Sequence, residues 1–298
     1  MEHTRTVTRE FETGDHAVLQ LESRSGAVIV EGRESDRVVV DAVVRVWTDL
    51  SAEADDAAAL VAQSMQQDGN RVTVRAPSLP RRDGWAALFG QGSRVEYTVR
   101  VPRRTEVRLL SKSGSVHVLR TEGALRVEAL SGRLTVEEVR GDVTLVSRSG
   151  ALTVQRVTGA VEIESRSGKV TVQEISGPVA IEARSGAIET KDVAGDVRVS
   201  ARAGSLSVEN AGARVYARTR AGSMRYRGRV LGDFDLEAVA GSITLAVDPD
   251  YPFFVDAESH GGSVRSDLPP RRNGAEPAEG GPKVRVRTRA GSIRLTRA

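Results

Sequence analysis

The chain has 298 residues, of which 28% are charged and 4% aromatic, and its formal net charge is +3 at pH 7. It contains no cysteine, which excludes disulfides and thiolate chemistry. Neither an apolar segment behind the N-terminal Met-Glu-His nor an apolar run of roughly 18 residues occurs, so we expect no secretory signal and no transmembrane segment. The simplest interpretation is a cytoplasmic protein, and its small net charge permits acidic partners without requiring them.

Residues 1–110 are expected to form an N-terminal part made of strands and a cap. Apolar and polar residues alternate through most of the first 47 residues, which is the periodicity of β-strands. The sequence Ser23-Arg24-Ser25-Gly26 stands between two such alternating runs, and a longer β-rich run follows from Arg37 to Trp47.

Residues 51–67 depart from this alternation and predict one amphipathic helix. Ser51 is the candidate N-cap, and acidic residues fill the first turn, where a helix favours negative charge. Its short apolar face consists of Leu60, Val61, Ser64 and Met65. We expect this helix to cover an end or a flank of the strands, because an uncovered strand row invites pairing with another chain.

Residues 77–92 form an inserted loop between two further expected strands. The loop carries three large apolar side chains, Trp85, Leu88 and Phe89, which loops seldom hold together. Two interpretations remain: the loop folds back as a plug, or it presents an exposed apolar tip to a protein partner or a membrane surface. The three residues are therefore candidate partner-binding residues.

Residues 111–247 contain a tandem repeat with an 18-residue period. Its glycines are Gly114, Gly132, Gly150, Gly168, Gly186, Gly204, Gly222 and, one residue late, Gly241. A second set lies midway between them, at Gly123, Gly141, Gly159, Gly177 and Gly195. The unit is therefore a nine-residue half-turn used twice, and a fixed period of this kind is typical of a solenoid.

Within each repeat, apolar residues alternate with polar ones on both sides of the corner glycine. Val161 and Ile163 precede Gly168, and Val170 and Val172 follow it. Coiling the chain would stack such residues into continuous apolar columns, with each glycine at a corner. The sequence therefore predicts an all-β protein, a single-stranded β-solenoid of 18-residue coils with one N-terminal capping helix.

Residues 248–298 predict irregular C-terminal coils. The corner sequence returns at residues 259–264 and again at 289–293, which we expect to be the last coil. Between them lies a loop at residues 269–282 that is rich in proline and glycine.

An arginine occurs two positions before the corner glycine in five consecutive repeats. This arginine ladder consists of Arg148, Arg166, Arg184, Arg202 and Arg220. One interpretation is a solvated face on which arginines interleave with glutamates such as Glu164 and Glu182, each exposed pair contributing about 0–1 kcal/mol. The other is a cationic edge that binds a repeating polyanion, such as a wall polymer, an acidic polysaccharide or nucleic acid, because the guanidinium fork suits anionic groups.

Several other functions are disfavoured by the residues present. No aromatic residue interleaves with the ladder, so bases could not stack on it, and we do not expect sequence-specific nucleic-acid binding. Calcium-binding nonapeptide repeats need a repeated aspartate, but Asp142 and Asp196 alternate with Ala160 and Pro178 in that column. The four histidines lack metal-ligand spacing, and no catalytic residue, metal site or cofactor is predicted.

The repeated Ser-Arg-Ser-Gly-Xaa-Val-Xaa-Val, with Val-Xaa-Gly between copies, resembles the bacterial putative adhesin family of β-strand-repeat proteins, a domain of unknown function. The resemblance covers most of the chain, from the corner at Gly26 onward. It implies a β-solenoid and no established catalytic or binding residue, and some members accompany cell-envelope stress systems.

The expected function is that of a non-enzymatic binding or scaffold rod, with an acidic polymer or a protein as partner. The first alternative is a structural element that self-assembles through the solenoid ends. The second is a carbohydrate-active enzyme, which would need a cleft that breaks the repeat.

Overall fold

The computed structural model describes residues 1–48, 50–77, 93–248, 253–268 and 281–298. Within these ranges the protein is β-structure with one helix, as the sequence predicts. It divides into two compact units, residues 1–147 and 148–298. Trp85, Leu88 and Phe89 lie outside the described residues, as does most of the 269–282 loop.

The first unit begins with strands on both sides of the helix. Its elements are β1 (Glu2–Glu12), β2 (His16–Ser23), β3 (Val28–Arg33), β4 (Arg37–Trp47), α1 (Ser51–Gln63), β5 (Met65–Asp68), β6 (Arg71–Val74), β7 (Arg94–Pro102), β8 (Arg104–Ser111), β9 (Ser115–Leu119) and β10 (Leu125–Val139). The division between the units falls within β11 (Val143–Val157).

The regular pairing of the first unit is parallel. Leu125 of β10 pairs with Val107 of β8, which stands one 18-residue period earlier in the sequence. Val107 pairs in turn with Leu19 of β2, across a much longer stretch of chain. The corner at Gly26 is likewise followed directly by the corner at Gly114, since a Cβ on Gly114 would collide with the Gly26 carbonyl. The segment between β3 and β8 is therefore an insertion into the repeat.

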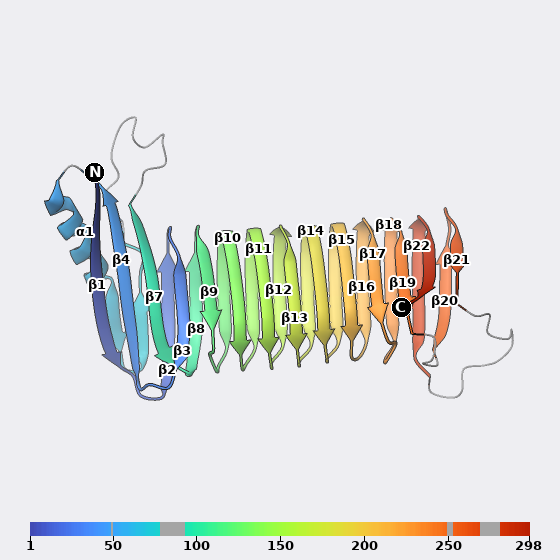
Figure 1. Cartoon of the computed structure of the whole chain (residues 1–298), viewed down its shortest axis with the longest axis horizontal. Coiled ribbons are helices and arrows are strands. Elements are labelled where there is room, and N and C mark those ends of the chain that lie inside the picture. The colour runs from blue at the N-terminus through green and yellow to red at the C-terminus, as the bar shows by residue number, and fades with distance from the viewer. Residues whose placement is uncertain (49, 78–92, 249–252, 269–280) are drawn as a thin grey trace. The chain divides into compact units, whose positions relative to one another are not determined.

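This insertion supplies the helix and the strands β4 and β7, which form antiparallel pairs. β1 pairs antiparallel with β4, and β4 pairs antiparallel with β7. Helix α1 packs against β1 and β4 (Figure 1). The helix thus covers a flank of these strands, one of the two placements that we expected.

The helix is shorter than the sequence predicted, and its buried face includes the expected Val61 but not Leu60. It ends at Gln63 rather than at residue 67, because Met65 begins β5 and pairs with Val74 of β6. Its buried residues are Ala54, Ala57 and Val61, whereas the expected Leu60 is 40% exposed. Ser51 is the first helical residue and not the N-cap; that position is Leu50, which makes no side-chain capping bond.

The second unit consists of strands alone in its described part. After the remainder of β11 come β12 (Val161–Ser167), β13 (Val170–Ile175), β14 (Val179–Val193), β15 (Val197–Ala211), β16 (Val215–Ala221), β17 (Met224–Gly228), β18 (Phe234–Ala240), β19 (Ile243–Val247), β20 (Phe254–Ser259), β21 (Val264–Ser266), β22 (Lys283–Ala290) and β23 (Ile293–Arg297). Successive strands of the regular repeat pair in parallel with an 18-residue offset, as Val179 pairs with Val197.

The last strands of the sequence are not the last in the pairing order. β22 pairs with both β18 and β20, and β23 pairs with both β19 and β21 (Figure 1). The expectation that residues 289–293 form the final coil is therefore wrong. These residues lie between the strands of residues 234–247 and those of residues 254–266. The chain passes through β20 and β21 first and then comes back, so that β22 and β23 pair with strands on both of their sides.

The apolar columns predicted from the repeat form the core of the second unit. Val161, Ile163, Val170, Val172 and Ile175 are each no more than 1% exposed. Their polar neighbours on the same strands lie on the outside, as strand alternation requires. Fully burying a side chain of this size contributes about 1.5–3 kcal/mol, so each turn of the repeat depends on its neighbours for stability.

Two kinds of corner recur with the 18-residue period. At the first, Gly186 has a φ of +126°, and a Cβ there would collide with the carbonyl oxygen of Gly168. The preceding serine ties the same corner, since Ser185 Oγ donates to the carbonyl of Arg166 at 3.2 Å. The second corner, which the midway glycines predicted, also places residues other than glycine in the left-handed region, and the sequence did not reveal these: Arg120, Glu138, Arg156, Glu174, Asp192 and Asn210.

We predict that Gly186→Ala destabilises the protein by about 2–5 kcal/mol, through backbone strain and the collision with Gly168. Chemical and thermal unfolding would measure the loss. Gly14→Ala is the control, because Gly14 has a φ of +72° but no heavy atom near its Cβ position. Equal losses in the two variants would show that the close carbonyl approach is not the constraint.

Tyr97 and Tyr226 are buried in the core, and burial raises the pKa of each phenol from 10.0 to about 12. The folded state therefore holds its protons above pH 10, where the unfolded state releases them. Stability should fall as pH rises from about 10 towards 12. Phenolate absorbance during an alkaline titration would show two phenols that ionise at a higher pH than ordinary tyrosines. Tyr97→Phe should remove one of these two late steps, and Tyr226→Phe should remove the other. Unchanged late amplitude in either variant would contradict this assignment.

Candidate functional site

The five arginines of the ladder lie in one exposed column of the second unit. They are carried by β11, β12, β14, β15 and β16. Ser165 pairs with Ala183 and Ser167 with Ser185, so Arg166 and Arg184 occupy the same position on neighbouring strands. The same register continues through Arg202 to Arg220. Because paired strands lie about 4.8 Å apart, the guanidinium groups project from one edge at that spacing.

The column continues beyond Arg220 in an order that the sequence does not give. Val239 takes the next position, and it is 39% exposed. Arg289 follows, because β22 pairs directly with β18. His260 comes last, with its backbone N–H donating to the carbonyl of Thr288 at 3.1 Å. The late strand β22 thus adds a sixth guanidinium group to the column.

The ladder arginines have no acidic partner within the described residues. Among the residues that the structure describes, none of the five forms an ion pair, although Glu164 and Glu182 lie two positions away on the same strands. Neighbouring columns are paired instead, as Arg218 is with Glu237 at 2.9 Å. The column is therefore solvated but without the interleaved arginine–glutamate ion pairs within the described residues, and whether it binds a ligand stays a prediction.

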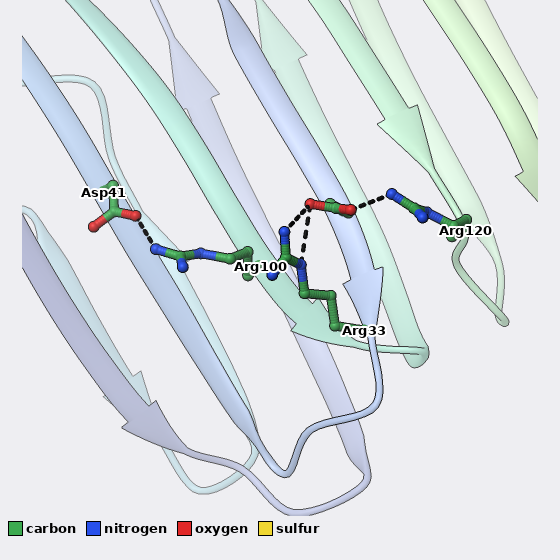
Figure 2. Close-up of polar contacts among 5 residues, drawn as sticks. Arg33, Asp41, Arg100 and Arg120 are labelled. Atoms are coloured by element: carbon green, nitrogen blue, oxygen red, sulfur yellow. Dashed lines mark hydrogen bonds and ion pairs between the residues drawn. The ribbon is translucent and has the colours of Figure 1, made fainter.

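Arginines in the first unit are arranged differently. The Glu31 carboxylate, whose side chain is 16% exposed, accepts from Arg33 at 2.9 Å and also from Arg120 (Figure 2). On the adjacent strands, Arg100 donates to Asp41 (Figure 2). These guanidinium groups already have carboxylate partners, unlike those of the ladder.

A second exposed arginine column lies across the glycine corner from the ladder. Arg225 pairs with Thr244, Thr244 with Arg294, and Arg294 with Arg265. These three arginines also form no ion pair with a described residue. They were not among the sequence-predicted residues, because the ladder is defined by the position two before each glycine.

The only described tyrosine in an outward column lies between arginines. The guanidinium carbons of Arg198 and Arg218 lie 5.1 and 4.7 Å from the centre of the Tyr216 ring. Nearby, a shallow groove of about 630 Å³ includes Asp233, whose Oδ1 accepts from the backbone N–H of Lys283 at 2.8 Å. This carboxylate therefore fastens β22 in place.

Metal-ligating residue types are dispersed over the described part of the chain. Its histidine, aspartate and glutamate side chains form no group of three that could hold a metal ion. No helix within the same residues is long and apolar enough to span a membrane.

A family model described as Toastrack DUF4097 matches residues 16–296. The curated proteins include no match to the chain. Among solved structures, similarity extends to a putative cell adhesion protein from Clostridium sporogenes at 8% identity, covering 99% of this chain and 100% of that one, with a TM-score of 0.27.

Two further solved structures are similar over nearly their whole length. A putative lipid binding protein from Parabacteroides distasonis is 11% identical, with 97% of this chain and 96% of that one covered and a TM-score of 0.41. A putative adhesin from Bacteroides fragilis is 13% identical, with 98% and 97% covered and a TM-score of 0.27. TM-scores this low transfer no property to the present chain.

We predict that Glu31→Gln destabilises the protein by about 1–2 kcal/mol, because it removes the charged acceptor shared by Arg33 and Arg120. The loss should shrink at high salt, where the remaining like charges are screened. Urea unfolding at low and high salt would measure it. Glu182→Gln is the matched control, as Glu182 is exposed and has no ion pair with a described residue. Equal shifts in both variants would contradict a specific role for Glu31.

Proposed function

This chain belongs to the Toastrack DUF4097 family, and from that premise we propose that it is a non-enzymatic binding protein whose ligand is a polyanion. In this proposal each turn of the repeat is an 18-residue solenoid coil, made of two nine-residue half-turns. The parallel 18-residue register and the recurring corners support that architecture. The coil serves to align identical side chains along one edge.

The observation that carries the proposal is the uncompensated charge of the arginine ladder. Five guanidinium groups stand in consecutive repeats, exposed, and without an acidic partner among the described residues. Each retains planar donors that match the oxygens of an anionic group. Neutralising several such charges at once, with release of counterions, would provide binding energy that depends strongly on salt.

The spacing of the ladder favours a polymer over a small anion. The arginines are distributed along an open edge at about 4.8 Å per strand, so they do not converge on one point. A single small anion could contact only neighbouring members. A linear chain with repeated negative charges could contact the whole column, and each further contact would add to the affinity.

A second candidate function is self-assembly through the C-terminal strands. β20 and β21 each pair on one side only within the described residues, and Phe254 and Val264 remain 46% and 44% exposed. An edge of this kind can pair with another chain. Sedimentation over a range of protein concentrations would test this candidate, and a monomer at every concentration would reject it.

We predict that replacing the five ladder arginines with glutamine abolishes salt-sensitive binding of heparin and of inorganic polyphosphate. For polyphosphate, the slope of log affinity against log salt should become shallower by roughly 0.7 for each phosphate that the variant no longer neutralises. Titration of the labelled full chain at several salt concentrations would measure both quantities.

The control carries the same number of substitutions in the first unit, at arginines that have carboxylate partners: Arg37, Arg103, Arg108, Arg126 and Arg140. This control should bind like the wild type. Wild-type affinity in the ladder variant, or equal loss in the control, would reject the ladder as the binding site.

A further inference from the structure

A six-residue pattern recurs at the corners of the second unit. Residues 220–225 read Arg-Ala-Gly-Ser-Met-Arg, and residues 289–294 read Arg-Ala-Gly-Ser-Ile-Arg. Residues 260–265 carry a close variant, His-Gly-Gly-Ser-Val-Arg. The pattern places a basic residue on each side of the glycine, with a serine immediately after it. The apolar fifth residue is an inward-facing core position in the first two copies.

Backbone hydrogen bonds bring these corners together despite their separation in the sequence. The N–H of Met224 donates to the carbonyl of Ser242, and the N–H of Ile243 donates to the carbonyl of Ser292, both at 2.9 Å. The N–H of Ile293 then donates to the carbonyl of Ser263, also at 2.9 Å. The N–H of Leu206 donates to the carbonyl of Ser223 at 2.9 Å, so Ser205 stands next to Ser223 and five serines are neighbours in the order 205, 223, 242, 292 and 263.

The hydroxyl groups of this serine column are available. Ser223, Ser242, Ser292 and Ser263 are exposed, and no side-chain hydrogen bond joins their hydroxyls to a described residue. Serines that precede the glycine at earlier corners differ, because Ser185 Oγ, for example, donates to a backbone carbonyl, whereas Ser205, which follows Gly204, is exposed and makes no side-chain hydrogen bond to a described residue. The change from a serine before the glycine to a serine after it thus frees a hydroxyl at each of these corners.

Unpaired arginines flank the serine column on both sides. Arg220 and Arg289 belong to the ladder side, and Arg225, Arg294 and Arg265 to the other. None of the five has an ion pair with a described carboxylate. The corner therefore combines a central row of hydroxyl donors with a row of guanidinium donors on each side, and we call it the serine–arginine corner.

We propose that the serine–arginine corner is the specificity-determining part of the polyanion site, and that it binds tetrahedral oxyanion groups, phosphate or sulfate esters, in preference to carboxylates. This inference rests on the proposed function, since it concerns the same polymer. It adds the chemical class of the charged group and places its recognition at the C-terminal corners of the second unit.

The donor arrangement gives the physical reason for this preference. A carboxylate offers two coplanar oxygens, which one guanidinium fork can satisfy by itself. A phosphate or sulfate group directs oxygens out of any single plane, so it offers acceptors both to guanidinium groups and to a serine hydroxyl in a different direction. Removing the hydroxyls should therefore weaken the binding of tetrahedral groups and leave carboxylate binding almost unchanged.

The test compares two triple variants of the full chain. Ser223→Ala/Ser242→Ala/Ser292→Ala removes hydroxyls without changing charge, and Arg225→Gln/Arg265→Gln/Arg294→Gln removes the far arginine row. The matched charge control is Arg37→Gln/Arg108→Gln/Arg126→Gln in the first unit. Probes are inorganic polyphosphate, heparin and polyglutamate, and circular dichroism with thermal unfolding verifies that each variant is folded.

We expect the serine variant to lose roughly threefold to tenfold in affinity for polyphosphate or heparin, and nothing for polyglutamate. The far-arginine variant should lose tenfold or more in affinity for the same two polymers, which corresponds to about one charged contact or more. The control variant should keep the wild-type affinity. Loss with polyphosphate alone identifies phosphate as the ligand group, and loss with heparin alone identifies sulfate.

Two results would overturn the inference while leaving the proposed function intact. One is wild-type affinity in both triple variants when the five-arginine ladder variant has lost binding. The other is polyglutamate binding as tight as that of both other probes. Wild-type affinity in the ladder variant as well would reject the proposed function itself.

Discussion

The fold depends on the close approach of backbone at the glycine corners. In the second unit, a Cβ on Gly168, Gly186, Gly204 or Gly222 would collide with the carbonyl of the glycine one repeat earlier. Their φ values lie between 124° and 136°, a region that residues with a Cβ hardly ever adopt. The positive φ and the nearby carbonyl both exclude a Cβ atom at the corner position. A shift of the strand pairing by one residue would therefore place a side chain against a carbonyl. The corner therefore fixes the register, and a fixed register aligns every outward position into a column.

The second corner includes a left-handed position that the glycine pattern does not mark. Glu174 and Asp192 have φ values of 55° and 52°, which lie in the left-handed α region. That region costs a residue with a side chain about 1–2 kcal/mol but does not exclude it. Asn210 offsets part of this cost, as its Nδ2 donates to Asp192 Oδ1 at 2.8 Å. Since several residue types tolerate the position, no repeated letter marks it in the sequence.

Local features of the fold were predictable from the sequence, and long-range order was not. Alternation gave the buried columns around Ile163 and Val172, and glycine spacing gave the first corner and the arginine ladder. The helix end was misplaced, because the pairing of Met65 with Val74 overrides a favourable helical pattern. The position of β22 between β18 and β20 depends on which strand edge is vacant, and periodicity carries no such information. For the same reason, the serine–arginine corner was visible as a repeated pattern but not as one surface.

The separation between glutamate and arginine along a strand does not explain why the ladder arginines have no ion pair with a described residue. In the first unit, Arg108 pairs with Glu106 at 2.7 Å and Arg126 with Glu128 at 2.9 Å, each across two positions of one strand. Glu164 and Arg166 have the same separation, yet they do not pair. Stacked guanidinium groups about 4.8 Å apart repel by roughly 1 kcal/mol per neighbouring pair in bulk water. A polyanion laid along the column would replace this repulsion with attraction. The repulsion that the folded chain retains is thus part of the free energy available for binding.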